Sequence, residues 1–277
     1  MSTPDDRLRH ALASLPQPRH RNAFLLGLFV CMTIGLVCFV WRLGGANPPA
    51  RDGLLLVGAV GGLVGALAFG IALGVHLHRI RDQQRALVAA ALGLELVPKV
   101  PRELRHTVFA PFAALPMLRT GGKGIRYHMS GEHAGEWIDL VEHVYVVSTG
   151  KSSHVVVHTA AATPCPPGWP ALSLTPRSGL AKLWEAIVGE DLQVESRVFN
   201  DRWTIRTASN DFAILFLSPE VQDFLSHAGV HETWHVSAGS LCWVARTRLS
   251  PAELAAAVAR QATLRAMVPP ELDEWGP

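Results

Sequence analysis

Residues 23–41 read AFLLGLFVCMTIGLVCFVW, and residues 53–77 read GLLLVGAVGGLVGALAFGIALGVHL. The first run carries no charged side chain, and the only polar side chain of the second is His76. An α-helix rises about 1.5 Å per residue, so about 20 apolar residues cross a hydrocarbon core about 30 Å thick. Both runs are long enough, and both lack the polar face that a helix of a soluble protein normally keeps. They predict a transmembrane helical hairpin with spans at 23–41 and 53–77.

Arginines are more numerous on the outer flanks of this hairpin than in the loop between its spans. The flanks hold Arg7, Arg9, Arg19, Arg21, Arg79, Arg81 and Arg85, and the loop holds Arg42 and Arg51. Positive charge favours the cytoplasmic side of a membrane. We therefore expect a two-pass protein of the bacterial inner membrane with both termini in the cytoplasm, residues 1–22 forming a tail. A signal peptide is the rival interpretation, but a second span follows directly.

Small residues recur every four positions along the second span, at Gly58, Gly62, Ala66, Gly70 and Gly74. Residues four apart share one helix face, and small side chains let helices approach closely in lipid. The stripe predicts helix packing, either within the hairpin or by self-association. Neither span holds an acidic or basic residue, which argues against an ion pathway.

Composition narrows the expected partners. The formal net charge is +2, so nothing indicates binding to nucleic acid. Cys165 and Cys242 lie far apart in the sequence, and no CxxC pair occurs, so neither a zinc cluster nor a disulfide framework is indicated. The lipid bilayer is the first expected partner.

Residues 78–277 alternate runs typical of strands with helical segments. Strands are expected at 126–130, 137–148, 154–159, 172–174, 194–198, 203–207, 233–236 and 241–246. Gly150–Ser153, Asn200–Asp201 and Ser237–Ser240 have turn composition, so the flanking strands are expected to pair as hairpins. Helices are expected at 180–188 and after Ser218 and Ser250, whose hydroxyls suit helix N-caps. The pattern predicts a cytoplasmic α+β domain with an antiparallel sheet and several helices.

Three stretches of this domain carry a resemblance: GEHAGE at 131–136, FNDRWTIRTASNDFAILFLSP at 199–219 and WHVSAGSLCWVARTRLSPAEL at 234–254. Through them, residues 85–270 resemble a group of uncharacterised bacterial membrane-anchored proteins. Members of that group pair one or two N-terminal helices with a cytoplasmic α+β domain of unknown function. The resemblance implies architecture and location and brings no reaction with it.

Residues 231–235 read HETWH and match the HExxH string of zinc hydrolases. On a helix, the spacing would place His231 and His235 on one face as zinc ligands, with Glu232 as the general base. However, Gly229 ends the preceding helical segment, and the following residues favour a strand. Residues four apart in a strand are separated by about 13 Å, which is too far to share one ion.

We therefore expect a strand here, with Thr233 and His235 on one side and Trp234 and Val236 facing the core. Glu232 is expected at the surface, where replacement by glutamine changes stability by less than about 0.5 kcal/mol.

Two further groups of residues suggest chemistry. Five histidines, His128, His133, His143, His154 and His158, lie close together in the sequence. They form either a metal or pH-sensing site or a set of scattered surface side chains. GGKG at 121–124 and TGKS at 149–152 each match only part of GxxxxGK[ST]. The second is expected to join two strands, whereas a phosphate loop opens a helix, so nucleotide binding is not expected.

The sequence thus favours a membrane-tethered cytoplasmic module that is not an enzyme and holds no cofactor. It is expected to bind a protein partner or a lipid headgroup at the inner membrane face. A membrane-bound zinc hydrolase that uses His231, Glu232 and His235 is the alternative.

Overall fold

A computed structural model describes residues 49–118, 120–177, 192–229 and 232–275, with short pieces before residue 49. The chain divides into two compact units. One is Ser14–Leu87, and the other is Val88–Pro277 together with Met1–Ala13. Each unit is described by itself.

The first unit contains most of helix α3, which runs from Pro49 to Leu92. Within the described residues, one helical segment is long and apolar enough to cross a membrane, and it is Val60–Leu92. Its large apolar side chains are exposed, as at Leu63 and Leu67. The expected first span, 23–41, lies mostly outside the described residues. Where it is described, 32–37 are helical, and a Cβ added at Gly27 would lie 2.7 Å from Cζ of Phe69 on α3.

The second unit is built on one antiparallel sheet of eight strands in the order β1-β2-β3-β4-β8-β7-β5-β6. The strands are β1 (Glu95–Val97), β2 (Ile125–His133), β3 (Glu136–Ser148), β4 (Ser153–Pro164), β5 (Leu172–Pro176), β6 (Trp203–Thr207), β7 (Glu232–Ser237) and β8 (Ser240–Ala245). With its helices, this sheet confirms the predicted α+β architecture. The predicted turns at Gly150–Ser153 and Ser237–Ser240 join β3 to β4 and β7 to β8.

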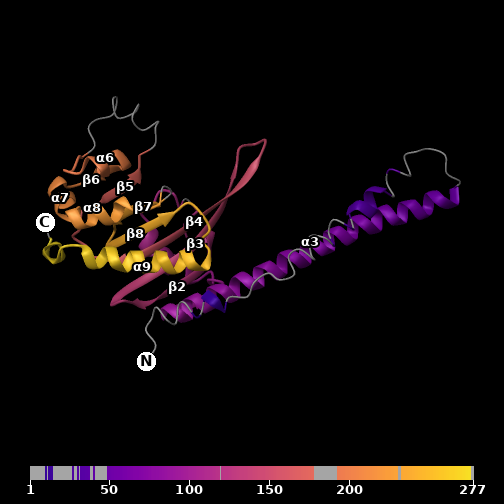
Figure 1. Ribbon diagram of the computed structural model, residues 1–277, viewed down its shortest axis with the longest axis horizontal. Coiled ribbons are helices and arrows are strands. Elements are labelled where there is room, and N and C mark those ends of the chain that lie inside the picture. The colour runs from indigo at the N-terminus through magenta and orange to yellow at the C-terminus, as the bar shows by residue number, and fades with distance from the viewer. Residues whose placement is uncertain are drawn as a thin grey trace. The chain divides into compact units, whose positions relative to one another are not determined.

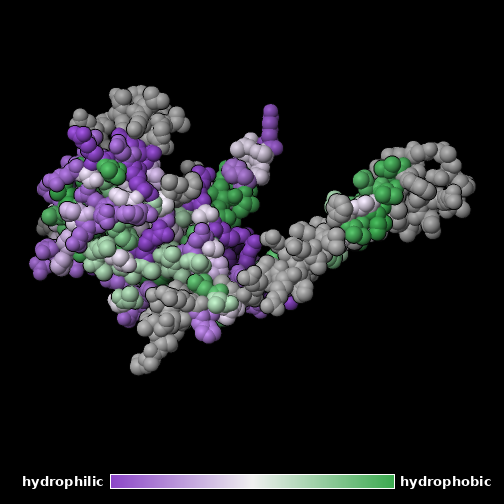
Figure 2. Space-filling model, in the orientation of Figure 1, coloured by the Kyte–Doolittle hydropathy of each residue, from purple (hydrophilic) through white to green (hydrophobic). Residues whose placement is uncertain are grey.

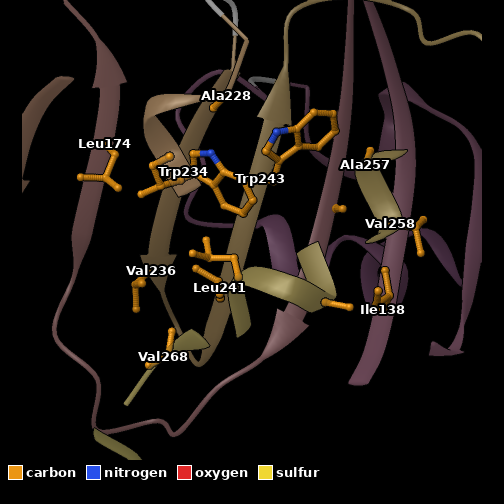
Figure 3. Close-up of a cluster of buried hydrophobic side chains, with 14 of the residues drawn as sticks. Ile138, Leu174, Ala228, Trp234, Val236, Leu241, Trp243, Ala257, Val258 and Val268 are labelled. Carbon is orange, nitrogen blue, oxygen red and sulfur yellow. The ribbon is translucent and has the colours of Figure 1, made fainter. Parts of the chain in front are cut away.

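Helices cover one face of the sheet and enclose the main core (Figures 1 and 3). They are α6 (Arg197–Arg202), α7 (Asn210–Phe216), α8 (Pro219–Ser226), α9 (Pro251–Met267) and the short η3 (Pro270–Glu274). Helix α9 packs against β2, β3, β4 and β8. It begins with the predicted capping box, in which Ser250 and Glu253 each satisfy the other's backbone N–H.

A second, smaller core lies on the opposite face. The segment between β1 and β2 covers it with α4 (Arg105–Phe109), η1 (Ala110–Phe112) and η2 (Gly121–Gly124). Phe112, Leu115 and Leu118 of this segment are buried against Val141 of β3 and Val244 of β8. This covering segment carries the candidate site described below.

The strand predicted at 194–198 and its hairpin turn at Asn200–Asp201 are wrong. Ser196 caps α6 by accepting a hydrogen bond from the Phe199 backbone N–H, and Phe199 is fully buried. Burial of an aromatic side chain outweighs the weak preference of a turn dipeptide. The helix predicted at 180–188 lies outside the described residues.

The β3–β4 hairpin extends beyond the rest of the sheet (Figure 1). Val146 and Val155 face each other across it and are both 63% exposed. In Figure 2 this hairpin shows an apolar patch beneath a polar tip. The tip holds the TGKS string, which is a turn between strands and opens no helix.

Candidate functional site

The described part of the HETWH string lies on strand β7, and His231 is outside the described residues. Trp234 and Val236 face the helix-covered core, as predicted. His235 lies on the other side, with Nε2 3.1 Å from Oγ1 of Thr233. Glu232 and His235 are three apart, so they point to opposite faces of the strand. Among the described residues, no group of three or more His, Cys, Asp or Glu side chains is placed to hold a metal ion.

Glu232 is a buried structural carboxylate, so its predicted surface position is wrong. Arg260 of α9 donates from Nη1 to both carboxylate oxygens, at 2.6 and 2.8 Å. Trp243 Nε1 donates to Oε2 at 3.0 Å. Even-numbered residues of β7 face the helices, so Glu232 shares the core face with Trp234. The carboxylate joins β7, β8 and α9.

We expect Glu232→Gln to lower the free energy of unfolding by about 1–3 kcal/mol, because it removes the charge-assisted bonds to Arg260. Urea unfolding of the full-length protein measures this loss. Glu195→Gln is the matched control: Glu195 is exposed, so its change should stay within about 0.5 kcal/mol. Equal effects of the two substitutions would contradict a structural role for Glu232.

The structure separates most of the five histidines. His143 and His158 are directly opposite each other on β3 and β4. His128 donates to Asp139 at 2.7 Å, His133 contacts a backbone carbonyl at 3.2 Å, and His154 is exposed. Only His143 and His158 therefore remain as a pair.

His143 anchors the η2 segment. It is fully buried, and its Nε2 is 3.0 Å from the Gly121 carbonyl and 2.9 Å from Thr120 Oγ1. A carbonyl only accepts, so Nε2 carries the hydrogen. Burial lowers the pKa of His143. Burial, assisted by His143 and Arg246, lowers the pKa of His158 to about 4. Both imidazoles are therefore neutral near pH 7.

Two glycines of the GGKG string allow this segment to pack closely. A Cβ at Gly122 would lie 2.6 Å from the Arg105 carbonyl oxygen. A Cβ at Gly124 would overlap the His143 ring and lie 2.6 Å from Thr120 Oγ1. The glycines therefore hold η2 against α4 on one side and against β3 on the other. Lys123 lies between them.

The result is a basic hollow of about 590 Å³. Its lining is Arg102, Arg105, His106, Gly122 and Lys123. Arg105 is positioned by a hydrogen bond from its Nε to the Val100 carbonyl, at 3.3 Å. Among the described residues, no acidic side chain is part of this lining. Three permanent positive charges around one hollow produce a positive local potential, which favours an anion over a cation.

Sequence reasoning missed the basic hollow because its walls come from two segments that only the fold brings together. A local signal exists in residues 102–106, RELRH, where basic side chains stand at positions i, i+3 and i+4. That spacing places them on one side of a helical turn. GGKG supplies the second wall. Its lysine lines the hollow and its glycines pack closely, but the string does not form a phosphate loop.

Comparisons with known proteins identify a similar solved structure and no family. No protein-family model matches the chain, and no curated protein matches it. Among solved structures, the chain is similar to the crystal structure of the mycobacterial trehalose monomycolate transport factor A, TtfA. The identity is 12%, the TM-score is 0.43, and the match covers 68% of this chain and 96% of that one.

Proposed function

We propose that this protein is a membrane-anchored, non-enzymatic module whose α+β domain binds a phosphate-type anion in the basic hollow. The anion is either the phosphate of a lipid headgroup or a free phosphorylated compound. The observation that carries the proposal is the convergence of Arg102, Arg105 and Lys123 on one hollow, whose described lining contains no acidic residue.

The charges suit a phosphate. A phosphate group carries up to two negative charges and three acceptor oxygens at neutral pH. Arginine binds such groups through two parallel N–H donors, and lysine adds a point charge. Among the described residues, neither Arg102 nor Lys123 has an ion-pair partner, so both side chains are available.

The walls are also held in place. Lys123 lies on a segment that His143 anchors and that packs against the Arg105 backbone. A site binds best when neighbouring contacts fix the elements that carry it, because less conformational entropy is lost on binding. The buried imidazole and the two glycines therefore support the hollow without contacting its ligand.

The anchor is proposed to be a two-pass hairpin in the bacterial inner membrane. Helix α3 supplies one span, and 23–41 would supply the other. The close approach of Gly27 to Phe69 supports packing of the two. The arginine distribution supports cytoplasmic termini.

Cysteine labelling tests this topology. In a variant without native thiols, we expect a cysteine at Ala46 to react with an impermeant maleimide on intact cells. Cysteines at Ser2 or Lys151 should react only after the membrane is opened. The reverse pattern would place the domain outside the cytoplasm.

Anion binding is tested with the full-length protein in phosphatidylcholine nanodiscs. We expect inorganic phosphate and glycerol 3-phosphate to bind in calorimetric titrations, with affinity falling as salt increases. Lys123→Gln should weaken binding about tenfold, because one charge-assisted hydrogen bond is lost. Lys151→Gln makes the same change at the exposed hairpin tip and should have no effect.

A second arm distinguishes the two sources of phosphate. Phosphatidylglycerol is added to the nanodisc, and hydrogen exchange of residues 101–124 is measured. Protection by phosphatidylglycerol, lost in Lys123→Gln, identifies a lipid headgroup. Protection only by the free compounds identifies a soluble ligand. Absence of both effects would refute the anion site and favour a protein partner.

A further inference from the structure

A second hollow, of about 440 Å³, lies between strands β5, β6 and β7 and residues 114–116. The described lining residues of the two hollows do not overlap. Three of its polar side chains come from neighbouring strands, namely His235 of β7, Ser173 of β5 and Arg206 of β6.

These three side chains form one row across the sheet. His235 is paired with Ser173, and Ser173 is paired with Arg206. Directly paired residues of adjacent strands point to the same face, with Cβ atoms about 5 Å apart. Their chain neighbours Trp234, Leu174 and Ile205 belong to the helix-covered core, so the row lies on the opposite face. The sheet thus holds the polar groups at fixed spacing.

The described lining of this second hollow carries one permanent charge, that of Arg206. Arg206 is exposed and, among the described residues, has no carboxylate partner. His235 is only 7% exposed, and burial lowers its pKa to about 4, so it is neutral near pH 7. Ser173 contributes a hydroxyl group, which donates or accepts a hydrogen bond.

The opposite wall of the hollow is apolar and consists of Ala114, Leu115 and Pro116. Pockets for small molecules combine such apolar walls with a few polar groups that fix orientation. The single cation of this hollow matches a ligand with one negative charge. The three cations of the basic hollow match a phosphate instead. A guanidinium with a neighbouring hydroxyl suits the two oxygens of a carboxylate.

We propose that this hollow is a second binding site, for a small monocarboxylic acid with an apolar body. Arg206 and Ser173 hold the carboxylate, His235 borders it, and the apolar body lies against Leu115 and Pro116. The site is independent of the anion site proposed above.

The test is a ligand-observed NMR titration of the full-length protein in phosphatidylcholine nanodiscs, with empty nanodiscs as the blank. The probe is hexanoate. Hexanamide has the same body without the charge, and acetate has the charge without the body. Both should bind at least about tenfold more weakly than hexanoate, because each loses one of the two recognised features. Excess inorganic phosphate should not displace hexanoate.

Two variants act on the site separately. Arg206→Gln should weaken hexanoate binding by about tenfold or more. Ala114→Trp fills the hollow from an exposed position and should abolish binding. Arg102→Gln, the matched control in the basic hollow, should bind hexanoate like the wild type. Thermal unfolding of each variant verifies that it is folded.

Three results would overturn the proposal: absence of hexanoate binding, equal binding of hexanoate and hexanamide, or equal binding by the wild type and Arg206→Gln. Loss of hexanoate binding in Arg102→Gln, or displacement by phosphate, would assign the ligand to the basic hollow instead. Loss of phosphate binding in Lys123→Gln with unchanged hexanoate binding would show that the two sites bind their ligands independently.

Discussion

Replacing Trp234 with alanine is expected to lower the free energy of unfolding by about 3–5 kcal/mol. Trp234 is 1% exposed and lies at the centre of the main core. It is paired with Trp243 of β8 and with Leu174 of β5, and Figure 3 shows the three side chains together. Truncation removes a large apolar surface and leaves a cavity in the core above a sheet whose strands are fixed by their ladders. Urea unfolding followed by tryptophan fluorescence measures the loss.

Two controls define the cause. Trp137→Ala makes the same change at a position that is 50% exposed, so we expect a loss below about 1 kcal/mol. Trp234→Phe retains most of the buried area. It also removes an indole N–H that is buried without a hydrogen-bond partner among the described residues, so its cost should be less than about 1.5 kcal/mol. A loss at Trp137 as large as that at Trp234 would contradict this account of the core.

Acid is expected to destabilise the domain between pH 6.5 and pH 4. The pKa values of His158 and His235 are lowered to about 4 in the folded protein, chiefly by burial, against 6.5 in the unfolded chain. Over this interval the unfolded chain binds protons that the folded protein does not, so stability falls as the pH falls. The free energy of unfolding is lowered by about 3 kcal/mol per histidine at pH 4 relative to neutral pH.

Urea unfolding at several pH values measures this dependence in the full-length protein. Carboxylates also titrate near pH 4. The contribution of each histidine is therefore obtained by comparing, between variants, the slope of the free energy of unfolding against pH. His235→Gln should flatten the slope between pH 6.5 and pH 4, whatever its effect on stability at pH 7. His154→Gln changes an exposed histidine and should leave the slope unchanged. An unchanged slope in His235→Gln would contradict a buried, neutral His235.

Local patterns predicted those elements whose cause is local. The capping box at Ser250–Glu253 marks the start of α9, and Ser218-Pro219 marks the start of α8. Alternation along 233–236 predicted which side chains of β7 enter the core. In each case neighbouring residues provide the hydrogen bond or the periodicity, so the information is contained in a short stretch.

Other predictions failed where residues distant in the sequence determine the local structure or the burial of a side chain. The turn preference of Asn200–Asp201 yields to burial of Phe199 in α6. Glu232 looked like a surface residue because its partner, Arg260, is on a helix 28 positions later in the chain. The pairing of β5 with β7 was not predicted at all, because it places Ser173 beside His235 although 62 positions separate them in sequence.

The sequence by itself determined that the chain has an apolar helix long enough for a membrane and an α+β domain with an antiparallel sheet. Hydrophobic length and periodicity are properties of contiguous residues, and they do not depend on the rest of the fold. Only the tertiary structure decided which polar groups meet. The sheet order brings Arg206 and His235 to one row, and the packing of Gly122 and Gly124 brings Lys123 to the arginines of α4 and the turn before it. Such meetings depend on strand order and close packing between segments far apart in the chain, which no local pattern encodes.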